Sequence, residues 1–167
     1  MKHKRSIIIA GVSVTLVGVA FIFAPIARDR ARRTRCMSNL SCLGKTLMMY
    51  AMDHDEAYPT NAGCMADYAD NVRIYICPGS GTRPPASLSV EGYTNWVDYI
   101  LIPWSNGVAT PGEYPLMYDR RLSHHQGKGI NVLWVDGRVV WDKNAKGLKR
   151  FAEEHPQLEI PMPEDLE

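Results

Sequence analysis

"RARRTRCMSNLSCLGKTLMMYAMDHDEAYPT" occupies residues 30–60 and decides the fold, because its apolar residues follow a helical repeat. They recur at steps of four and three residues, which places them on one face of a helix: Cys36, Leu40, Leu43, Leu47 and Tyr50. No proline interrupts the chain between Pro25 and Pro59, and Pro59 disfavours helix at the residue before it. The pattern therefore predicts one long helix from about residue 6 to about residue 54.

An apolar run precedes this stretch. Residues 6–27, "SIIIAGVSVTLVGVAFIFAPIA", contain no charged side chain. A helix of about 20 apolar residues spans a bilayer, and glycine and proline are tolerated in such helices. A cleaved signal peptide is the alternative, but its apolar region is about 7–15 residues and ends at a small-residue cleavage site. We expect an uncleaved, single membrane-spanning helix.

Charge is distributed unevenly along the chain. Residues 1–35 carry eight basic side chains and one acidic one, whereas the remaining 132 carry eleven basic and seventeen acidic, a net charge of −6. An acidic body argues against nucleic acid as a partner, because binding there depends on Lys and Arg. The arginines at 28–35 are instead expected to contact anionic lipid headgroups, so the lipid bilayer is the predicted partner.

The orientation in the membrane stays open at this point. Basic residues flank both ends of the apolar run, and the larger number on the C-terminal side favours a cytoplasmic body. Four cysteines in a small chain favour an oxidising compartment instead: Cys36, Cys42, Cys64 and Cys77. Their spacing contains no CxxC pair, which argues against a zinc ribbon or a redox motif.

The rest of the chain predicts an α+β body in which the long helix lies on a small antiparallel sheet. We expect a short helix at 64–71, strands at 72–78, 92–104 and 113–121, and a loop at 79–92. Pro115 favours an edge position for its strand. Residues 130–141 predict a hairpin with a two-residue type I′ turn at Asp136-Gly137 and one buried face. A helix at 144–154 and an extended acidic tail follow.

These elements give five segments. They are a basic N-terminus (1–5), a transmembrane helix (6–27), an arginine collar with the extramembrane half of the helix (28–60), a globular body (61–154) and a proline-rich tail (155–167).

Residues 30–60 resemble the helix of type IV pilin-like and type II secretion pseudopilin-like proteins. More narrowly, they are similar to a large paralogous family of planctomycetes and their relatives. The matching residues of the helix and its end are Cys36, Asn39, Leu40, Leu43, Tyr50, Ala51 and Pro59. "YICPGS" at 75–80, with Cys77 and Pro78, is similar to the Cys-Pro-Ser segment of that family. The family's late motif places nine residues between a His and Asp-Gly, whereas ten separate His125 from Asp136-Gly137 here.

The resemblance implies a pilin-like structural protein rather than an enzyme. It also implies a single-pass protein of the cell inner membrane with a periplasmic or extracellular body, whose partners are other pilin-like subunits or secretion machinery. The prepilin processing signature, a Gly followed by aromatic-Thr-Leu-Ile-Glu, is missing from residues 4–16, "KRSIIIAGVSVTL". Its absence favours a permanently anchored protein over a filament subunit.

The cysteines allow several states. Cys36 and Cys42 lie about 240° apart around a helix, so they cannot bond to each other. Cys36 and Cys77 match the family and are the first expected pair, which leaves Cys42 with Cys64. Free, buried thiols are the alternative.

Residues 124–143, "HHQGKGINVLWVDGRVVWDK", raise the question of a metal or catalytic site. On an extended segment His124 and His125 point to opposite faces and do not easily share one metal. Asp136 suits a turn, so a structural hairpin is the favoured interpretation and no cofactor is expected. Pseudopilins often hold calcium near their C-terminal loops, which leaves as metal candidates Asp119, His125, Asp136 and Asp142. The acidic run at 53–56 lacks the glycine of a calcium loop and predicts a solvated helix end.

Two other function classes remain open. The first is a membrane-tethered binding module that uses Trp96, Trp104, Trp134 and Trp141, although core packing is the more usual role of such residues. The second is a metal-dependent enzyme that uses His124, His125 and Asp136.

Overall fold

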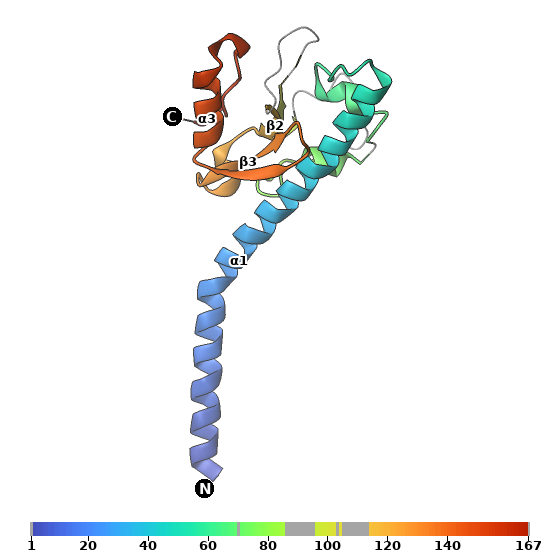
Figure 1. Cartoon of the computed structure of the whole chain (residues 1–167). Coiled ribbons are helices and arrows are strands. Elements are labelled where there is room, and N and C mark those ends of the chain that lie inside the picture. The colour runs from blue at the N-terminus through green and yellow to red at the C-terminus, as the bar shows by residue number, and fades with distance from the viewer. Residues whose placement is uncertain (1, 70, 86–95, 103, 105–113, 167) are drawn as a thin grey trace. The chain divides into compact units, whose positions relative to one another are not determined.

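The computed structural model describes residues 2–69, 71–85, 96–102, 104 and 114–166, with side chains described from residue 21 onward except at 22. The chain divides into two compact units, Met1–Ala31 and Arg32–Glu167. In the first unit the described backbone is helical, and it begins helix α1 (Lys2–Asp53) (Figure 1). The helix continues through Pro25 and ends one residue before the predicted end, so the expectation of a long N-terminal helix is confirmed.

The predicted membrane span at 6–27 falls mostly on residues whose side chains lie outside the described part of the chain. Within that described part, no helix has both the length and the apolar character needed to cross a bilayer.

The second unit contains a four-stranded antiparallel sheet with strands in the order β1-β2-β3-β4. The strands are β1 (Tyr99–Leu101), β2 (Pro115–Asp119), β3 (Gly129–Trp134) and β4 (Val139–Lys143). Each strand pairs with the next one along the chain, for example Tyr99 with Asp119 and Val132 with Val140. The predicted α+β class is therefore confirmed for this unit.

Helix α1 covers one face of this sheet. Its apolar stripe is completely buried, at Cys36, Leu40, Leu43 and Leu47. Gly44 lies at a close approach of helix and sheet, since a Cβ there would stand 3.0 Å from Leu133 Cδ1. Burial of each leucine contributes roughly 1.5–3 kcal/mol relative to exposure, so the helix is a main part of the core.

Helix α3 (Lys146–Glu154) packs against the sheet from the other side (Figure 1). Its buried residues are Leu148 and Phe151, and the Phe151 ring meets Trp134 edge to face at 5.8 Å. The predicted helix at 144–154 is thus confirmed. The prediction of a single buried face for the hairpin is wrong, because α1 and α3 together bury every residue of β3 from Gly129 to Leu133.

The hairpin of β3 and β4 turns near the predicted site but by a different turn. Gly137 N–H donates to the carbonyl oxygen of Trp134, and Trp134 N–H donates to the carbonyl oxygen of Arg138, both at 2.9 Å. Of the turn residues only Gly137 has a positive φ, +82°. The predicted type I′ turn is therefore wrong. The loop is a three-residue connection in which a left-handed glycine closes the bulge.

Three predictions of local structure need correction. Residues 72–75 form a 3-10 helix, η2 (Val72–Tyr75), rather than a strand, because the Asn71 side chain accepts from Arg73 N–H and starts a turn. The short helix expected at 64–71 occurs earlier, as η1 (Ala62–Met65). Strand β2 lies inside the sheet rather than at its edge, since Pro115 is its first residue and the register is irregular there.

Strand β1 accounts for only three residues of the strand expected at 92–104, of which 92–95 and 103 lie outside the described residues. The loop expected at 79–92 lacks regular structure at 79–85, and its remaining residues also lie outside the described part.

The acidic tail packs onto the body instead of extending from it. It includes the short 3-10 helix η5 (Pro156–Leu158), and Ile160 is buried. Tyr118 donates its hydroxyl to the carbonyl oxygen of Pro161, and Glu164 forms ion pairs with two arginines of the body. Composition predicted an extended tail because it reports charge and proline content but not these long-range partners.

Candidate functional site

Four side chains of metal-ligand type meet in the core where α1 crosses the sheet. They are Cys36 in α1, Cys77 in the loop after η2, Asp119 at the end of β2 and His125 at the end of η4 (Leu122–His125). Their exposed fractions are between 0% and 1%. One ligand atom of each lies within 4.8 Å of all the others. We call these four residues the core cluster.

Each member reaches the core cluster for a local reason. Cys36 begins the apolar stripe of α1, and Asp119 pairs with Tyr99 in the sheet. His125 is carried by a tight 3-10 turn whose next residue, Gln126, is left-handed with φ of 60°. Asp165 of the tail accepts from the N–H groups of Leu122 at 2.6 Å and Ser123 at 2.9 Å, which fixes the start of that turn.

Asp119 is the centre of the hydrogen bonds in the core cluster. Cys36 Sγ lies 2.8 Å from Asp119 Oδ1, and His125 Nε2 lies 3.1 Å from Asp119 Oδ2. Cys77 Sγ lies 3.6 Å from the same His125 nitrogen. His125 therefore faces both Asp119 and Cys77 through Nε2.

A second ring of polar groups donates toward the core cluster. Asn131 donates from its backbone N–H at 2.6 Å and from Nδ2 at 3.0 Å to Asp119 Oδ2. Gly79 N–H donates to Cys77 Sγ at 3.4 Å, and the Tyr99 hydroxyl lies 3.4 Å from Cys36 Sγ. A hydrogen-bond donor stabilises the negatively charged form of its acceptor, as the Gly79 N–H does for the Cys77 sulfur.

The core cluster shifts the protonation of its members. Hydrogen bonding to the adjacent Cys36 thiol is the main cause of a low pKa at Cys77, and His124 and His125 add to it. Burial opposes the shift, and the resulting pKa is about 3. Burial alone would lower the pKa of His125, but Asp119 and Cys77 outweigh it and raise that pKa to about 9. Burial raises the pKa of Cys36 well above its ordinary range. At neutral pH the imidazole of His125 therefore carries a positive charge beside the Cys77 thiolate.

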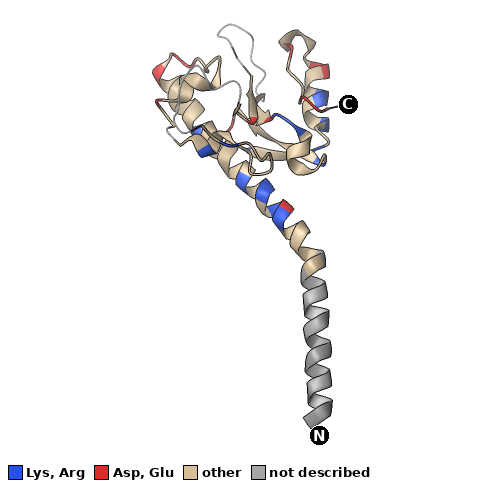
Figure 2. Ribbon diagram, turned by 180° about the vertical axis from the view of Figure 1, so that it is seen from behind, with Lys and Arg blue, Asp and Glu red and all other residues tan. Residues whose placement is uncertain are grey.

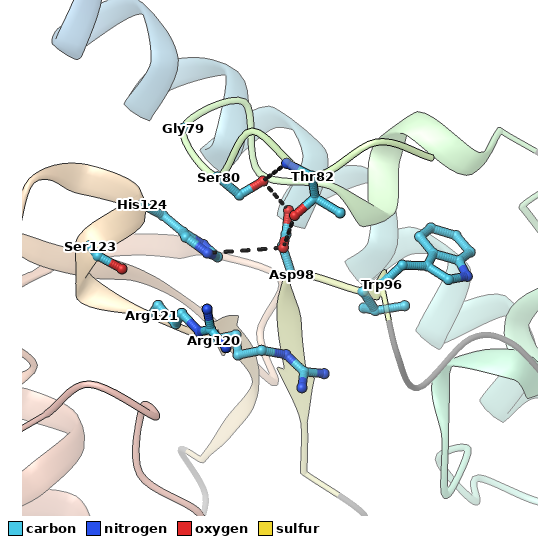
Figure 3. A pocket seen from close by; sticks show the side chains of 10 residues that line it. Gly79, Ser80, Thr82, Trp96, Asp98, Arg120, Arg121, Ser123 and His124 are labelled. Atoms are coloured by element: carbon cyan, nitrogen blue, oxygen red, sulfur yellow. Dashed lines mark hydrogen bonds and ion pairs between the residues drawn. The ribbon is translucent and has the colours of Figure 1, made fainter. Parts of the chain in front are cut away.

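A polar cavity of about 330 Å³ is lined by residues that adjoin the core cluster in the chain, such as Arg120 and His124 (Figure 3). Its lining includes Ser80, Thr82, Asp98, Arg120, Arg121 and His124. Asp98 accepts from Cys77 N–H at 3.0 Å and from Thr82 Oγ1 at 2.8 Å, and His124 Nε2 lies 3.9 Å from Asp98 Oδ1. Asp98 thus fixes the loop that presents Cys77. We call this region the Asp98 cavity.

The metal candidates from the sequence divide between different places. Asp119 and His125 lie together in the core cluster. Asp136 lies in the hairpin turn, where it accepts from Arg138 N–H at 3.0 Å and pairs with the Arg138 side chain. Asp142 accepts from the N–H groups of Gly147 and Leu148 and so caps helix α3. Each of the last two has a structural role.

The histidine pair also differs from its prediction. The segment is a 3-10 helix and not extended, but the two side chains still diverge, His125 into the core cluster and His124 toward Asp98. The enzyme hypothesis combined both with Asp136. In the structure His125 belongs to the core cluster, His124 to the Asp98 cavity and Asp136 to the hairpin turn.

All four cysteines are free thiols in this structure. Cys36 and Cys77 are buried and lie within 4.8 Å of each other, whereas Cys42 is exposed and Cys64 is half-buried. The expected closeness of the first pair is observed. The disulfides themselves remain predictions.

The other residues that carry the family resemblance have packing roles. Asn39 Nδ2 donates to the Ile76 carbonyl oxygen at 2.9 Å and so ties α1 to the segment that precedes Cys77. Tyr50 stacks on His54 with ring centroids 3.8 Å apart, near the helix end at Asp53. Pro59 is buried, and Pro78 follows Cys77 in the loop that reaches the core cluster.

The tryptophans are packed rather than displayed. Trp104 is buried and donates from Nε1 to the Pro115 carbonyl oxygen at 2.8 Å. Trp96 and Trp134 contact the core, and Trp141 meets His125 edge to face at 5.4 Å. The described contacts of the four tryptophans are therefore packing contacts.

Sequence reasoning missed three residues of the site, namely Asp98, Tyr99 and Asn131. They carry no motif of their own, because their partners are 12 to 63 positions away in the chain. A usable signal did exist, since Cys36, Cys77 and His125 are all among the residues that carry the family resemblance. Their joint occurrence could have indicated that they meet in space.

Comparison with known proteins finds no similar case. No protein-family model, curated protein or solved structure matches this chain.

Proposed function

We propose that the protein is a membrane-anchored, pilin-like structural protein, associated with a type II secretion-like or type IV pilus-like system. One observation carries the proposal, which is the contrast between two parts of α1. From Cys36 to Leu47 the apolar side chains of the stripe are completely buried in the body. Before the arginine run they are exposed, with 78% of Phe21 and 59% of Phe23 accessible.

Exposed phenylalanines on a helix need an apolar environment. Burial of such a side chain gains roughly 1.5–3 kcal/mol, and the described part of Met1–Ala31 offers nothing beyond the helix itself to cover it. A lipid bilayer supplies that environment. The arginines between 28 and 35, blue on α1 in Figure 2, are suited to the headgroup region at the end of such a span.

The proposal includes a location. The body lies outside the cytoplasm, in the periplasm or at the cell surface, and the chain passes once through the inner membrane. The pilin resemblance and the four cysteines support this orientation, against the larger arginine number on the body side. The missing prepilin signature supports a permanent anchor rather than incorporation into a filament.

Membrane anchoring is tested by cell fractionation with an alkaline carbonate wash. The full chain should remain in the membrane pellet. A Leu16→Arg substitution near the middle of the apolar run should release part of it, because a central arginine costs about 2.5–3.5 kcal/mol of insertion. Met52→Arg is the matched control, since Met52 is 83% exposed at the far end of the same helix. A wild-type chain in the soluble fraction would reject the anchor.

Orientation is tested by reporters fused after Glu167. An active alkaline phosphatase fusion together with a dark cytoplasmic fluorescent fusion is expected. The opposite pair of results would place the body in the cytoplasm and remove the secretion or pilus system from the proposal.

The alternative, a membrane-tethered binding module, has less support. It depended on tryptophans displayed at the surface, and the four tryptophans are buried or half-buried.

A further inference from the structure

We infer that Cys36, Cys77, Asp119 and His125 form a closed, four-coordinate site for a zinc ion that joins helix α1 to the sheet. The site is independent of the proposed membrane anchoring. It concerns how the body is held together.

The first argument is the spacing of the ligand atoms. Zinc binds thiolate at about 2.3 Å and imidazole or carboxylate at about 2.0–2.2 Å, so the edges of its ligand tetrahedron are about 3.3–3.8 Å long. In the core cluster Cys77 Sγ to His125 Nε2 is 3.6 Å and His125 Nε2 to Asp119 Oδ2 is 3.1 Å. Cys36 Sγ to Asp119 Oδ1 is 2.8 Å, and all four ligand atoms lie within 4.8 Å. Small side-chain movements convert these distances into a tetrahedron.

The second argument is the type of donor atom. Two sulfurs, one imidazole nitrogen and one carboxylate oxygen suit zinc, which prefers four mixed ligands of this kind. Calcium needs six to eight oxygen atoms, and the core cluster offers only the oxygens of Asp119. The donor set therefore selects a transition metal over calcium.

The third argument is the surroundings. Metal-bound thiolates and carboxylates are usually held by hydrogen-bond donors from a second layer of residues. Asn131 supplies two such donors to Asp119, and Gly79 supplies one to Cys77. These donors hold the Asp119 carboxylate and the Cys77 sulfur in position.

The fourth argument is burial, which defines the role of the metal. Catalytic zinc keeps one open position, whereas structural zinc is enclosed by four protein ligands. The core cluster has four ligands from four separate elements, and each is 0–1% exposed. The ion would therefore join α1, the Cys77 loop, β2 and η4. It has a structural role and no substrate position.

A disulfide between Cys36 and Cys77 is the competing state. It would use both sulfurs in a bond of about 2.05 Å and leave only Asp119 and His125 as ligands. The two states have different signatures, because zinc requires both cysteines as thiolates.

The experiment uses the full chain, purified in detergent with a reductant and without chelator. Elemental analysis should find about one zinc per chain, as a single closed site requires. Replacement of zinc by cobalt(II) should give intense visible bands of a tetrahedral ion and a charge-transfer band with the intensity of two thiolates. Addition of a chelator should lower the melting temperature of the wild-type chain.

Three kinds of variant locate the site. Cys36→Ser and Cys77→Ser should each halve the charge-transfer band or abolish binding, whereas the exposed Cys42→Ser should behave like the wild type. Asn131→Ala keeps all four ligands and should weaken metal affinity by about 10–100-fold. This last variant stays informative even if a ligand substitution prevents folding.

Several results would overturn the inference. One is a folded wild-type chain without metal whose four thiols all react with an alkylating reagent after denaturation. Another is a Cys36–Cys77 disulfide in peptide mapping of protein purified without reductant, if reduction does not then permit metal binding. A third is metal content or a cobalt spectrum that is unchanged when both Cys36 and Cys77 are replaced.

Discussion

The neighbouring histidines His124 and His125 lie in two different environments, the Asp98 cavity and the core cluster. His125 is 1% exposed and lies among two sulfurs and a carboxylate, the nearest of them 3.1 Å away. The side chain of His124 is 8% exposed and lies 3.9 Å from Asp98, beyond hydrogen-bond distance. The 3-10 helix produces this difference, because successive side chains in it are about 120° apart. One turn therefore divides its two histidines between a packed core and a polar cavity.

The comparison shows which carboxylate the fold depends on. Asp119 and Asp98 are both buried, and each accepts several hydrogen bonds. Asp119 also faces a histidine whose pKa is about 9, whereas two of the donors to Asp98 are the hydroxyl groups of Ser80 and Thr82. The core cluster should accordingly be the more costly region to disturb.

The largest expected effect comes from Asp119→Ala. It should lower the free energy of unfolding by about 3–5 kcal/mol, because it leaves a charged imidazole and two Asn131 donors buried without their acceptor. Asp98→Ala should cost less, about 1–3 kcal/mol, mainly from the unpaired Cys77 N–H. Urea denaturation of the full chain in detergent, followed by tryptophan fluorescence, measures both.

An exposed carboxylate provides the control for that pair. Glu153→Ala on α3 should change the unfolding free energy by less than about 0.5 kcal/mol. Equal losses for Asp119→Ala and Asp98→Ala would contradict the ranking of the two regions.

The next effect concerns Gly79, which joins the two regions. A Cβ at Gly79 would stand 1.9 Å from the carbonyl oxygen of His124, so Gly79→Ala forces the Cys77 loop and η4 apart. We expect a loss of about 3 kcal/mol, at the upper end of typical overpacking. Gly81→Ala is the matched control, since Gly81 has φ of +75° but a Cβ there would meet no described atom within 4 Å. It should lose only about 1–2 kcal/mol through backbone strain.

If the two glycine variants lose equal stability in thermal unfolding, the close approach of the loop to η4 does not matter. The core cluster and the Asp98 cavity would then be structurally independent. A larger loss at Gly79 indicates that they share one rigid loop.

A smaller effect separates the histidines themselves. His125→Ala should cost about 1.5–3 kcal/mol, the value of hydrogen bonds to charged groups. His124→Ala should cost at most about 1 kcal/mol, because its nearest described carboxylate oxygen is 3.9 Å away, beyond hydrogen-bond distance. Thermal unfolding of the two single variants tests this difference. A His124 loss that equals or exceeds the His125 loss would show that the 3-10 turn, and not the core cluster, sets the stability of this segment.

The sequence predicted those parts of the fold that depend on local periodicity. The stripe from Cys36 to Leu47 repeats at helical spacing, and the structure buries all of it against the sheet. Residues 144–154 and the hairpin around Gly137 follow the same rule, since each has a pattern that fits within about a dozen positions. For β3 and β4, which a short turn connects, a short-range pattern was enough.

The candidate site could not be predicted in the same way. Cys36 meets Asp119 across 83 positions, and Cys77 meets His125 across 48. The cysteine spacing argued against zinc because zinc motifs with CxxC pairs take two ligands from one short segment, whereas here each of the four ligands comes from a separate element. The family resemblance singled out Cys36, Cys77 and His125, and the calcium of pseudopilins added Asp119 as a metal candidate. Neither gave a reason to expect these four residues together.

The same limit applies to turns and tails. Asp136-Gly137 correctly marked a reversal of the chain, but the type of turn depends on how Trp134 and Arg138 pair. The acidic tail was expected to be extended because its own sequence holds no partner for Glu164. That partner is the arginine pair at 120 and 121, 44 and 43 positions earlier.

The smallest effect is a pH dependence that comes from this tail. The hydrogen bond from Arg121, together with Arg120, lowers the pKa of Glu164. Burial opposes a similar shift at Asp165, but hydrogen bonds from Ser123 and Leu122 outweigh it and lower that pKa. A carboxyl group with a lowered folded pKa contributes stability that is complete above its ordinary value, 4.5 for Glu164 and 3.8 for Asp165, and is lost as the pH falls through the folded value.

We therefore expect the unfolding free energy to decline below about pH 4.5, and part of that decline should be absent from a Glu164→Gln, Asp165→Asn double variant. Solvent screens both groups, so the difference between the two chains at neutral pH should be under about 1 kcal/mol. Added salt should reduce the Glu164 share further. Glu153→Gln, a change at an exposed carboxylate outside this contact, should keep the wild-type acid profile.

Because Asp165 caps the turn that carries both histidines, acid loss of this contact should loosen η4 before it reaches the buried core cluster. Hydrogen exchange at pH 4 that protects Leu122 and Ser123 as strongly as the strand residues would contradict this order.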